Sequence, residues 1–271
     1  MNFRFHFATL MILLFGVATA FAQFGGFDIG DIVKGGQGAA KVAKGAAGIG
    51  LKEERAMGGS LAVEIAAKQG GILKDEALTK RVATIGQALT LYCTRPDLKF
   101  TFAVLDNPGV NAFSAPGGYV FVTKGLVAMC KNDNELAGVL AHEIAHITRR
   151  HALKLISRNE TFKGLGEMGS AAGGNYTGYD DLLAGTLTTI LEKGFDPATE
   201  FDADQHGTLL MYDTGFPPKT LRDFLAKLKA GEGDDRPFST HPPTGHRIER
   251  LDEYIKENGL VKTATEKKSS D

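Results

Sequence analysis

The sequence lacks three features that would each indicate a class of protein. It carries 31 Lys and Arg residues against 32 Asp and Glu, a formal net charge of −1, and the absence of a basic excess argues against a nucleic-acid-binding protein. Two cysteines in 271 residues are too few for a disulfide scaffold. After residue 22 the longest apolar stretch is 182–191, far short of the ~20 residues that cross a membrane. These absences leave one globular domain with a sizeable core.

The N-terminus predicts a secretory signal peptide over residues 1–22. Arg4 and His6 precede an apolar run at 7–17, and small residues then offer an Ala-x-Ala cleavage site after Ala22. The alternative is an uncleaved membrane anchor, for which the run is short. We therefore expect an exported protein.

Glycine is unevenly distributed along the rest of the chain. Nine of the 34 glycines fall within residues 23–50, which predicts a flexible leader with little to bury. Helical spacing of apolar residues begins at Leu51, and residues 259–271 form a polar tail. The folded domain is therefore expected over residues 51–258.

The apolar spacing predicts an α+β fold that is mainly α. Helices are expected at 51–68 and 75–92, followed by strands at 99–105 and 119–123 with a short extended piece, 111–114, between them. We interpret these strands as a small antiparallel sheet. From residue 124 the pattern is helical, including one continuous helix over 135–157 and further helices at 180–193, 197–213 and 218–230.

The helix predicted at 135–157 contains the motif His142-Glu143-Ile144-Ala145-His146. Residues four apart lie on one helical face, so both imidazoles can bind one metal ion with Glu143 beside them. Zinc suits such ligands, and a catalytic zinc site keeps one position open for water. Two buried histidines and a glutamate without a metal would be costly in an apolar helix. The pattern predicts a zinc peptidase with one ion per chain.

The third ligand is expected on another helix. A continuous helix would turn His151 about 140° away from His146 and onto its packing face, and Arg149 and Ala152 exclude the longer HExxHxxGxxH motif. Glu200 and Asp204 share one helical face, so one carboxylate can bind the metal while the other accepts a hydrogen bond from a ligand imidazole. The alternative is a solvated acidic face.

Several motifs in order carry a family resemblance. HEIAH is followed by Glu200-x-x-Ala203-Asp204 and by Ser-Thr-His-Pro with Arg247 six residues after His241. This pattern resembles the gluzincin zinc metalloprotease family of the CAAX prenyl protease, HtpX and the mitochondrial Oma proteases, and most closely its soluble periplasmic bacterial members such as BepA and LoiP. The likeness runs from about Ala56 to Tyr254 and implies a zincin-like metalloprotease domain.

The resemblance implies a role for each site residue. His142, His146 and Glu200 would bind zinc, Glu143 would be the catalytic base, and Asp204 would hydrogen-bond to a ligand histidine. His241 and Arg247 would lie near the water or the substrate, and Asn111 and Ala112 would belong to the edge strand that aligns an extended peptide. His241 is our candidate for an oxyanion donor or for a fourth zinc ligand in a resting state. Arg247 is either a second donor or a structural ion pair.

These roles predict an endopeptidase in which Glu143 takes a proton from the attacking water. Strand addition recognises backbone more than sequence, so we expect unfolded or misassembled envelope proteins as substrates, in the periplasm of a Gram-negative bacterium. The protein is expected to be exported, peripheral attachment to a membrane stays open, and we expect no repeat domain for partner docking after the protease domain. The alternative is a chaperone or outer-membrane assembly factor with a silent or structural zinc site.

Cys93 and Cys130 form an even pair in an exported protein. Cysteines in oxidising compartments are commonly bridged, so we expect a disulfide between them. The alternative is two unpaired buried thiols, because the sequence does not give the Cα separation.

Overall fold

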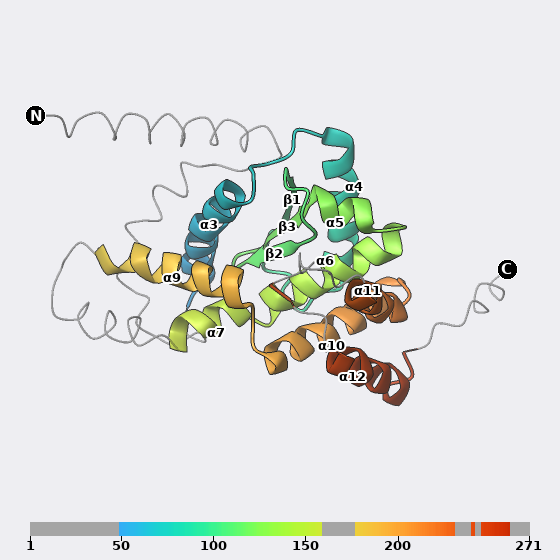
Figure 1. The fold of residues 1–271 in the computed structure, drawn as a ribbon. Coiled ribbons are helices and arrows are strands. Elements are labelled where there is room, and N and C mark those ends of the chain that lie inside the picture. Colours follow the sequence, from blue (N-terminus) through green and yellow to red (C-terminus); the bar gives the residue numbers. More distant parts are fainter. Residues whose placement is uncertain (1–48, 159–176, 231–239, 242–244, 261–271) are drawn as a thin grey trace, which may run out of the picture.

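A computed structural model describes residues 49–158, 177–230, 240–241 and 245–260 (Figure 1). The predicted signal peptide, nearly all of the predicted leader and the tail from residue 261 lie outside these described residues. Within them, no helix is both long and apolar enough to span a bilayer.

Helices dominate the described chain, and α3, α4, α10 and α11 begin and end close to the predicted positions. The elements in chain order are α3 (Leu51–Lys68), α4 (Glu76–Thr90), β1 (Thr101–Leu105), β2 (Ala112–Ala115), β3 (Tyr119–Thr123), α5 (Lys124–Met129), α6 (Asp133–Thr148), α7 (His151–Arg158), α9 (Thr177–Lys193), α10 (Pro197–Thr214), α11 (Lys219–Ala230) and α12 (Gly245–Glu257). The predicted fold class, α+β and mainly α, is confirmed.

The three strands form a mixed sheet in the order β1-β3-β2. Strand β2 pairs antiparallel with β3 through a tight turn in which Gly117 and Gly118 have φ values of 80° and 102°, a backbone conformation that favours glycine. Strand β1 instead pairs parallel with β3. The expectation of a wholly antiparallel sheet was therefore wrong for β1, because alternating side chains identify a strand but not its direction.

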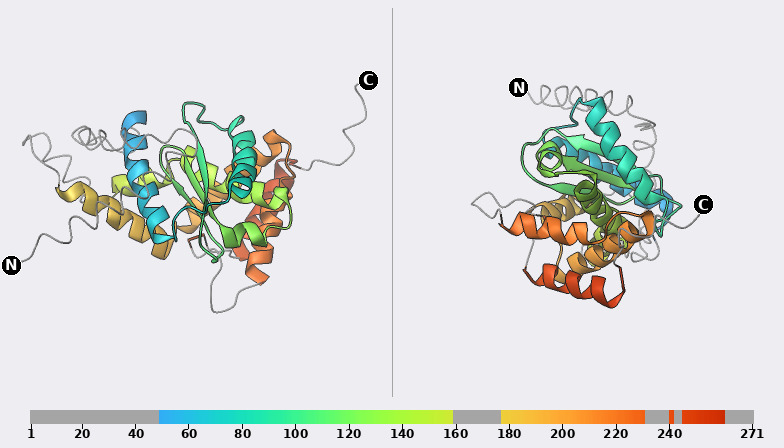
Figure 2. Two further views of the ribbon diagram at one scale, coloured as in Figure 1. Left: turned by 90° about the horizontal axis from the view of Figure 1, so that it is seen from above. Right: turned by 90° about the vertical axis from the view of Figure 1, so that its right-hand side faces the viewer.

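The sheet lies between two helical layers, because alternate side chains enter two different cores. Phe102, Val104 and Val120 pack with residues of α4 and α6. Ala103, Leu105 and Phe121 face the other way, toward residues of α3, α7 and α9. Figure 2 shows α3 and α9 on one side of the strands and α4 on the other. Strand β3 is buried along its whole length.

Helix α6 is the central element of the fold. Asn132 caps its first turn by accepting a hydrogen bond from the Glu135 backbone nitrogen at 3.1 Å, and every residue from Leu136 to Ile147 is buried. Helix α10 begins at Pro197 after the capping residue Asp196 and packs along α6. A side chain at Gly207 of α10 would lie 3.0 Å from the backbone nitrogen of His142, so glycine permits the approach.

The continuous helix predicted over 135–157 is interrupted in the structure. Helix α6 ends at Thr148, and Arg150 has a φ of 59°, a left-handed conformation that non-glycine residues rarely adopt. Helix α7 then begins at His151. The predicted orientation of His151 away from His146 was therefore wrong, because it required an unbroken helix.

The predicted disulfide is not present, since Cys93 and Cys130 are both free thiols. Each contacts the core between the sheet, α4 and α6, where it packs as a small apolar side chain. Burial raises the pKa of the Cys93 thiol and raises that of Cys130 to about 12. A thiol with so high a pKa forms little of the thiolate that disulfide formation requires.

The state of the cysteines gives a first prediction. Two thiols should react with a labelling reagent when the protein is unfolded in denaturant without a reductant. In the native protein Cys130 should stay unlabelled, because it is buried and protonated. Mass spectrometry of the labelled peptides distinguishes the two sites. Unfolded protein that takes up no label before reduction would show that the pair is bridged.

Candidate metal centre

Four buried side chains from three segments meet beside α6. His142 and His146 come from α6, Glu200 comes from the first turn of α10, and His241 comes from the segment before α12. One nitrogen or carboxylate oxygen of each lies within 4.8 Å of the others. Such a group could hold a metal ion, and it joins the three predicted ligands with His241.

The separations within the cluster match a tetrahedral zinc site. Zinc bonds of about 2.0–2.1 Å to nitrogen or oxygen place neighbouring ligand atoms about 3.3 Å apart. His142 Nε2 lies 3.1 Å from His146 Nε2, 3.3 Å from His241 Nδ1 and 3.4 Å from Glu200 Oε2. His146 Nε2 lies 3.6 Å from Glu200 Oε1. The donor set, two imidazoles on one helix with a carboxylate and a third imidazole, therefore fits zinc.

Glu143 is fully buried next to this cluster. Neither of its carboxylate oxygens makes a hydrogen bond within the described part of the chain, and Oε1 lies 3.4 Å from His241 Nε2. Buried carboxylates normally have hydrogen-bond partners, because the desolvated charge is otherwise costly. The described residues therefore offer no hydrogen bond that would offset the burial of the Glu143 carboxylate.

Asp204 and Arg247 contact the ligand-type side chains on the side away from the centre of the cluster. Asp204 Oδ1 lies 3.0 Å from His142 Nδ1, the ring nitrogen turned away from the cluster. Arg247 donates to both oxygens of Asp204, at 2.8 and 2.7 Å, and its Nη1 lies 3.0 Å from Glu200 Oε2 and from the His241 carbonyl. Of the two roles predicted for Arg247, the geometry favours the structural ion pair.

The charges of these groups shift their pKa values in opposite directions. Burial would lower the pKa of His142, but hydrogen bonds to Asp204 and Glu200 raise it to about 9. Burial lowers the pKa of His146 well below its usual range. Burial would raise the pKa of Glu200, but the charges of His241 and Arg247 hold it well below the usual carboxyl value. Burial would also raise the pKa of Asp204, but Arg247 lowers it. Glu200 and Asp204 are therefore both ionised.

The segment that carries His241 is tied to the start of β2. Thr240 Oγ1 donates a hydrogen bond of 2.9 Å to Asn111 Oδ1, and the Ala112 backbone nitrogen donates to the same oxygen at 3.0 Å. Strand β2, which begins at Ala112, lies at the edge of the described sheet. Asn111 and Ala112 therefore occupy the end of an edge strand beside His241.

His151 is a neighbour of the cluster that the sequence did not reveal. Its Nδ1 lies 3.0 Å from Nδ1 of His146, and its Nε2 lies 2.9 Å from Asp202 Oδ2. Burial lowers the pKa of His151 to about 4 although Asp202 acts in the opposite direction, so the ring is neutral. His246, in contrast, is exposed on α12.

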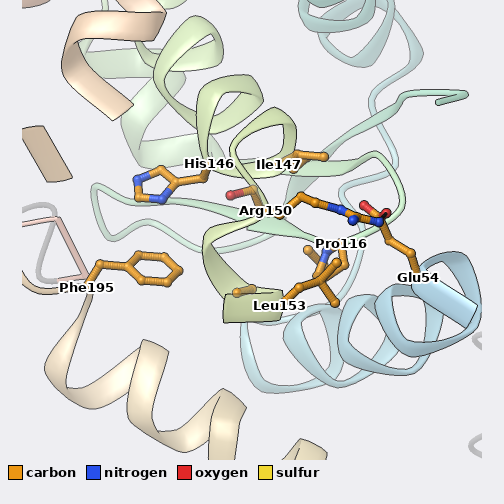
Figure 3. A pocket seen from close by; sticks show the side chains of 10 residues that line it. Glu54, Pro116, His146, Ile147, Arg150, Leu153 and Phe195 are labelled. Carbon is orange, nitrogen blue, oxygen red and sulfur yellow. Dashed lines mark hydrogen bonds and ion pairs between the residues drawn. The ribbon is translucent and has the colours of Figure 1, made fainter. Parts of the chain in front are cut away.

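A small hollow, partly open to solvent, adjoins His146 (Figure 3). Phe195 stacks on the His146 ring with centroids 4.6 Å apart and forms one wall. The end of β2 and the start of α7 supply most of the remaining lining: Ser114, Ala115, Pro116, Ile147, Ala152 and Leu153. The pocket is thus mainly apolar and lies between the candidate ligands and the edge strand.

Glu54 and Arg150 close the far end of this pocket. Glu54 is fully buried in α3, and its carboxylate binds Arg150 at 2.8 Å and Arg95 at 3.2 Å. Figure 3 shows Arg150 reaching from the end of α6 toward Glu54. No motif marks Glu54 in the sequence. The ion pair holds Arg150 where the chain turns from α6 into α7.

Two histidines of an HExxH helix that meet a glutamate from a second helix define the gluzincin class of metallopeptidases, as the resemblance implied. The chain belongs to peptidase family M48, whose profile matches residues 76–255. The match includes α4, the sheet, α6, α10 and nearly all of α12.

Relatives of this chain include a metalloendopeptidase and a protease. The chain is 32% identical over 169 residues to the mitochondrial metalloendopeptidase OMA1 of Schizosaccharomyces pombe. This alignment covers 59% of this chain and 48% of the relative. It is 29% identical over 202 residues to the beta-barrel assembly-enhancing protease of Yersinia pestis, which covers 71% of this chain and 40% of the relative. The chain therefore matches less than half the length of these relatives. The expected likeness to Oma and BepA-type proteins is confirmed.

The buried ion pairs of Arg247 give a second prediction. Arg247→Met should lower the free energy of unfolding of the metal-free protein by about 3–5 kcal/mol at pH 7, because Asp204 and Glu200 lose their buried cation. Arg247 lowers the pKa values of both acids, so its contribution is present above about pH 5 and is lost as the pH falls below about 4. Urea unfolding at several pH values measures the difference.

Lys256→Met is the matched control for this prediction, because Lys256 is exposed on the same helix. It should change the free energy of unfolding by no more than about 0.5 kcal/mol. A loss in Arg247→Met that is equally large at every pH would contradict the assignment to ionised Asp204 and Glu200.

Proposed function

We propose that this chain is a zinc-dependent endopeptidase with its active site at the cluster on α6. The observation that carries the proposal is the fully buried Glu143, without a hydrogen bond among the described residues, beside four ligand-type side chains at zinc-ligand separations. A purely structural zinc site needs no carboxylate at this position. Membership of peptidase family M48 and the names of the relatives support the same activity.

His142, His146 and Glu200 would hold one zinc ion per chain. When bound, zinc polarises a peptide carbonyl and makes water a stronger acid. Glu143 is placed to accept the proton of the attacking water and to deliver a proton to the leaving amine. Asp204 accepts from Nδ1 of His142, which leaves Nε2 of that ring free to face the metal.

His241 would serve two states of the enzyme. In this structure its Nδ1 belongs to the cluster, 2.9 Å from Glu200 Oε1, which supports a fourth ligand in a resting state. Its Nε2 lies on the side of Glu143, so a small movement of the ring away from the cluster would present a donor to the oxyanion formed next to Glu143. Arg247 holds the carbonyl of His241 through either state.

The substrate would bind as an added strand along the edge of β2, beginning near Asn111 and Ala112. Backbone hydrogen bonds along that edge accept many sequences. Unfolded or misassembled envelope proteins expose such strands. With the predicted signal peptide, this recognition supports a quality-control role in the periplasm of a Gram-negative bacterium. A chaperone or outer-membrane assembly factor with a silent zinc site is the alternative, which the next experiment tests.

The proposed base gives a third prediction. Glu143→Gln should lower the turnover of an unfolded protein by about 10²–10⁴-fold, because the amide cannot accept the proton. Its zinc content should equal that of wild type, since Glu143 is not among the proposed ligands. Peptide release followed by mass spectrometry, with metal analysis of the same samples, measures both quantities.

Glu135→Gln is the matched control, because Glu135 lies on the same helix and its partners are Lys131 and Lys227. It should leave turnover unchanged. Equal turnover by wild type and Glu143→Gln would disprove the mechanism. Zinc binding without any turnover by the wild type would favour the chaperone alternative.

The proposed resting state gives a fourth prediction. A hydroxamate inhibitor needs open positions on the metal, so wild-type protein must first displace His241 before it binds. His241→Ala should bind the hydroxamate roughly tenfold or more tightly, because displacement is no longer part of the equilibrium. Calorimetry on the zinc-loaded proteins measures the affinities, with His246→Ala as the control. Equal affinities in all three proteins would exclude His241 as a resting ligand.

A further inference from the structure

A chain of three polar side chains leads away from the cluster behind His146. His146 Nδ1, the ring nitrogen opposite the proposed zinc-binding Nε2, lies 3.0 Å from Nδ1 of His151. His151 Nε2 in turn lies 2.9 Å from Asp202 Oδ2. His146 and His151 are 2% and 4% exposed, so water has little access to either ring.

The local fold places His151 in this chain. Helix α6 ends two residues after His146, and the left-handed backbone of Arg150 redirects the chain so that the first residue of α7 returns to the His146 ring. Asp202 is fixed from the other side, because Arg149 donates to its two carboxylate oxygens at 2.8 and 3.2 Å. Arg149 thereby links the end of α6 to α10.

If His146 binds zinc through Nε2, one arrangement of protons satisfies all three groups. Asp202 is an acceptor, so His151 Nε2 must carry a hydrogen. The two facing Nδ1 atoms cannot both carry a hydrogen, so one of them is the acceptor. A His146 ring that binds zinc through Nε2 keeps its hydrogen on Nδ1, and Nδ1 of His151 is then the acceptor. His146 therefore carries its hydrogen on Nδ1, and its Nε2 has a free lone pair directed into the cluster. The opposite arrangement would place two lone pairs against each other at Asp202.

We propose that His151 and Asp202 are positioning residues, which fix the tautomer and the ring orientation of His146 for zinc binding. The inference rests on the proposed function only in taking His146 as a zinc ligand. Hydrogen bonds of this kind to a ligand imidazole are commonly worth a factor of 10–100 in metal affinity. The two ligand histidines are supported differently, because His142 contacts the carboxylate of Asp204 directly whereas a neutral ring separates His146 from Asp202.

Zinc affinity of the full chain, measured by competition with a chromophoric chelator, tests the proposal. His151→Leu removes the acceptor but keeps an apolar side chain of similar size, and its zinc affinity should fall about 10–100-fold. His151→Asn places an amide oxygen near the position of Nδ1, so it should retain an affinity close to wild type. Recovery by Asn distinguishes hydrogen bonding from simple packing.

Ile156→Ala is the control for lost stability, because Ile156 is fully buried in the same helix and contacts no proposed ligand. It should lower the free energy of unfolding and leave the zinc affinity unchanged. A folded His151→Leu protein that binds zinc as tightly as wild type would overturn the proposal. So would equal losses of affinity in the Leu, Asn and Ile156→Ala variants.

Nitrogen-detected NMR of the imidazole rings gives a second readout on the zinc-loaded wild type. It should show a hydrogen on Nε2 of His151 and on Nδ1 of His146. A hydrogen on Nδ1 of His151 would overturn the proposal even if no His151 variant folds. Neither readout requires peptide cleavage. If the protein binds zinc but does not cleave peptides, the zinc affinities and the NMR spectra still test the role of His151 and Asp202. A protein that binds no zinc would overturn both this proposal and the proposed endopeptidase function.

Discussion

The close packing of α10 against α6 is the constraint on which the site depends. Glycine at position 207 lets the two helices approach at His142, and this contact brings the first turns of α10 to the face of α6 that carries the HExxH histidines. Glu200 and Asp204 lie one helical turn apart. Glu200 then faces Nε2 of His146 inside the cluster, and Asp204 contacts Nδ1 of His142 on the side away from the cluster. A bulkier residue at 207 would separate the helices and with them the proposed ligands.

The same contact buries an unusual amount of charge. Glu143, Glu200 and Asp204 are each no more than 2% exposed, and Arg247 is 3% exposed. Buried charges of this kind add little net stability even when paired, so their arrangement reflects what the site must bind. A divalent cation in the cluster would supply the positive charge that a single guanidinium cannot, and its binding would stabilise the folded state by mass action.

Much of the site could be predicted from the sequence because its signals are local. The spacing of His142 and His146, and of Glu200 and Asp204, needs only the geometry of a helix. The position of His151 could not be predicted, because the break after α6 occurs at Arg150 and neither glycine nor proline marks it. The parallel pairing of β1 and the separation of the two thiols also depend on the tertiary fold, on which local periodicity carries no information. Glu54 was missed for the same reason, since its partners Arg95 and Arg150 lie far along the chain.

Helix α3 precedes the segment that matches the family profile, yet it is built into the same structural unit. Its apolar side chains supply part of the core beneath the sheet, and Glu54 neutralises the arginine at which the chain turns toward His151. A domain boundary drawn at residue 76 would remove the part of the hydrophobic core that α3 supplies. It would also remove Glu54, the ion-pair partner of Arg150. The folding unit therefore includes α3 and is longer than residues 76–255, which the family profile matches.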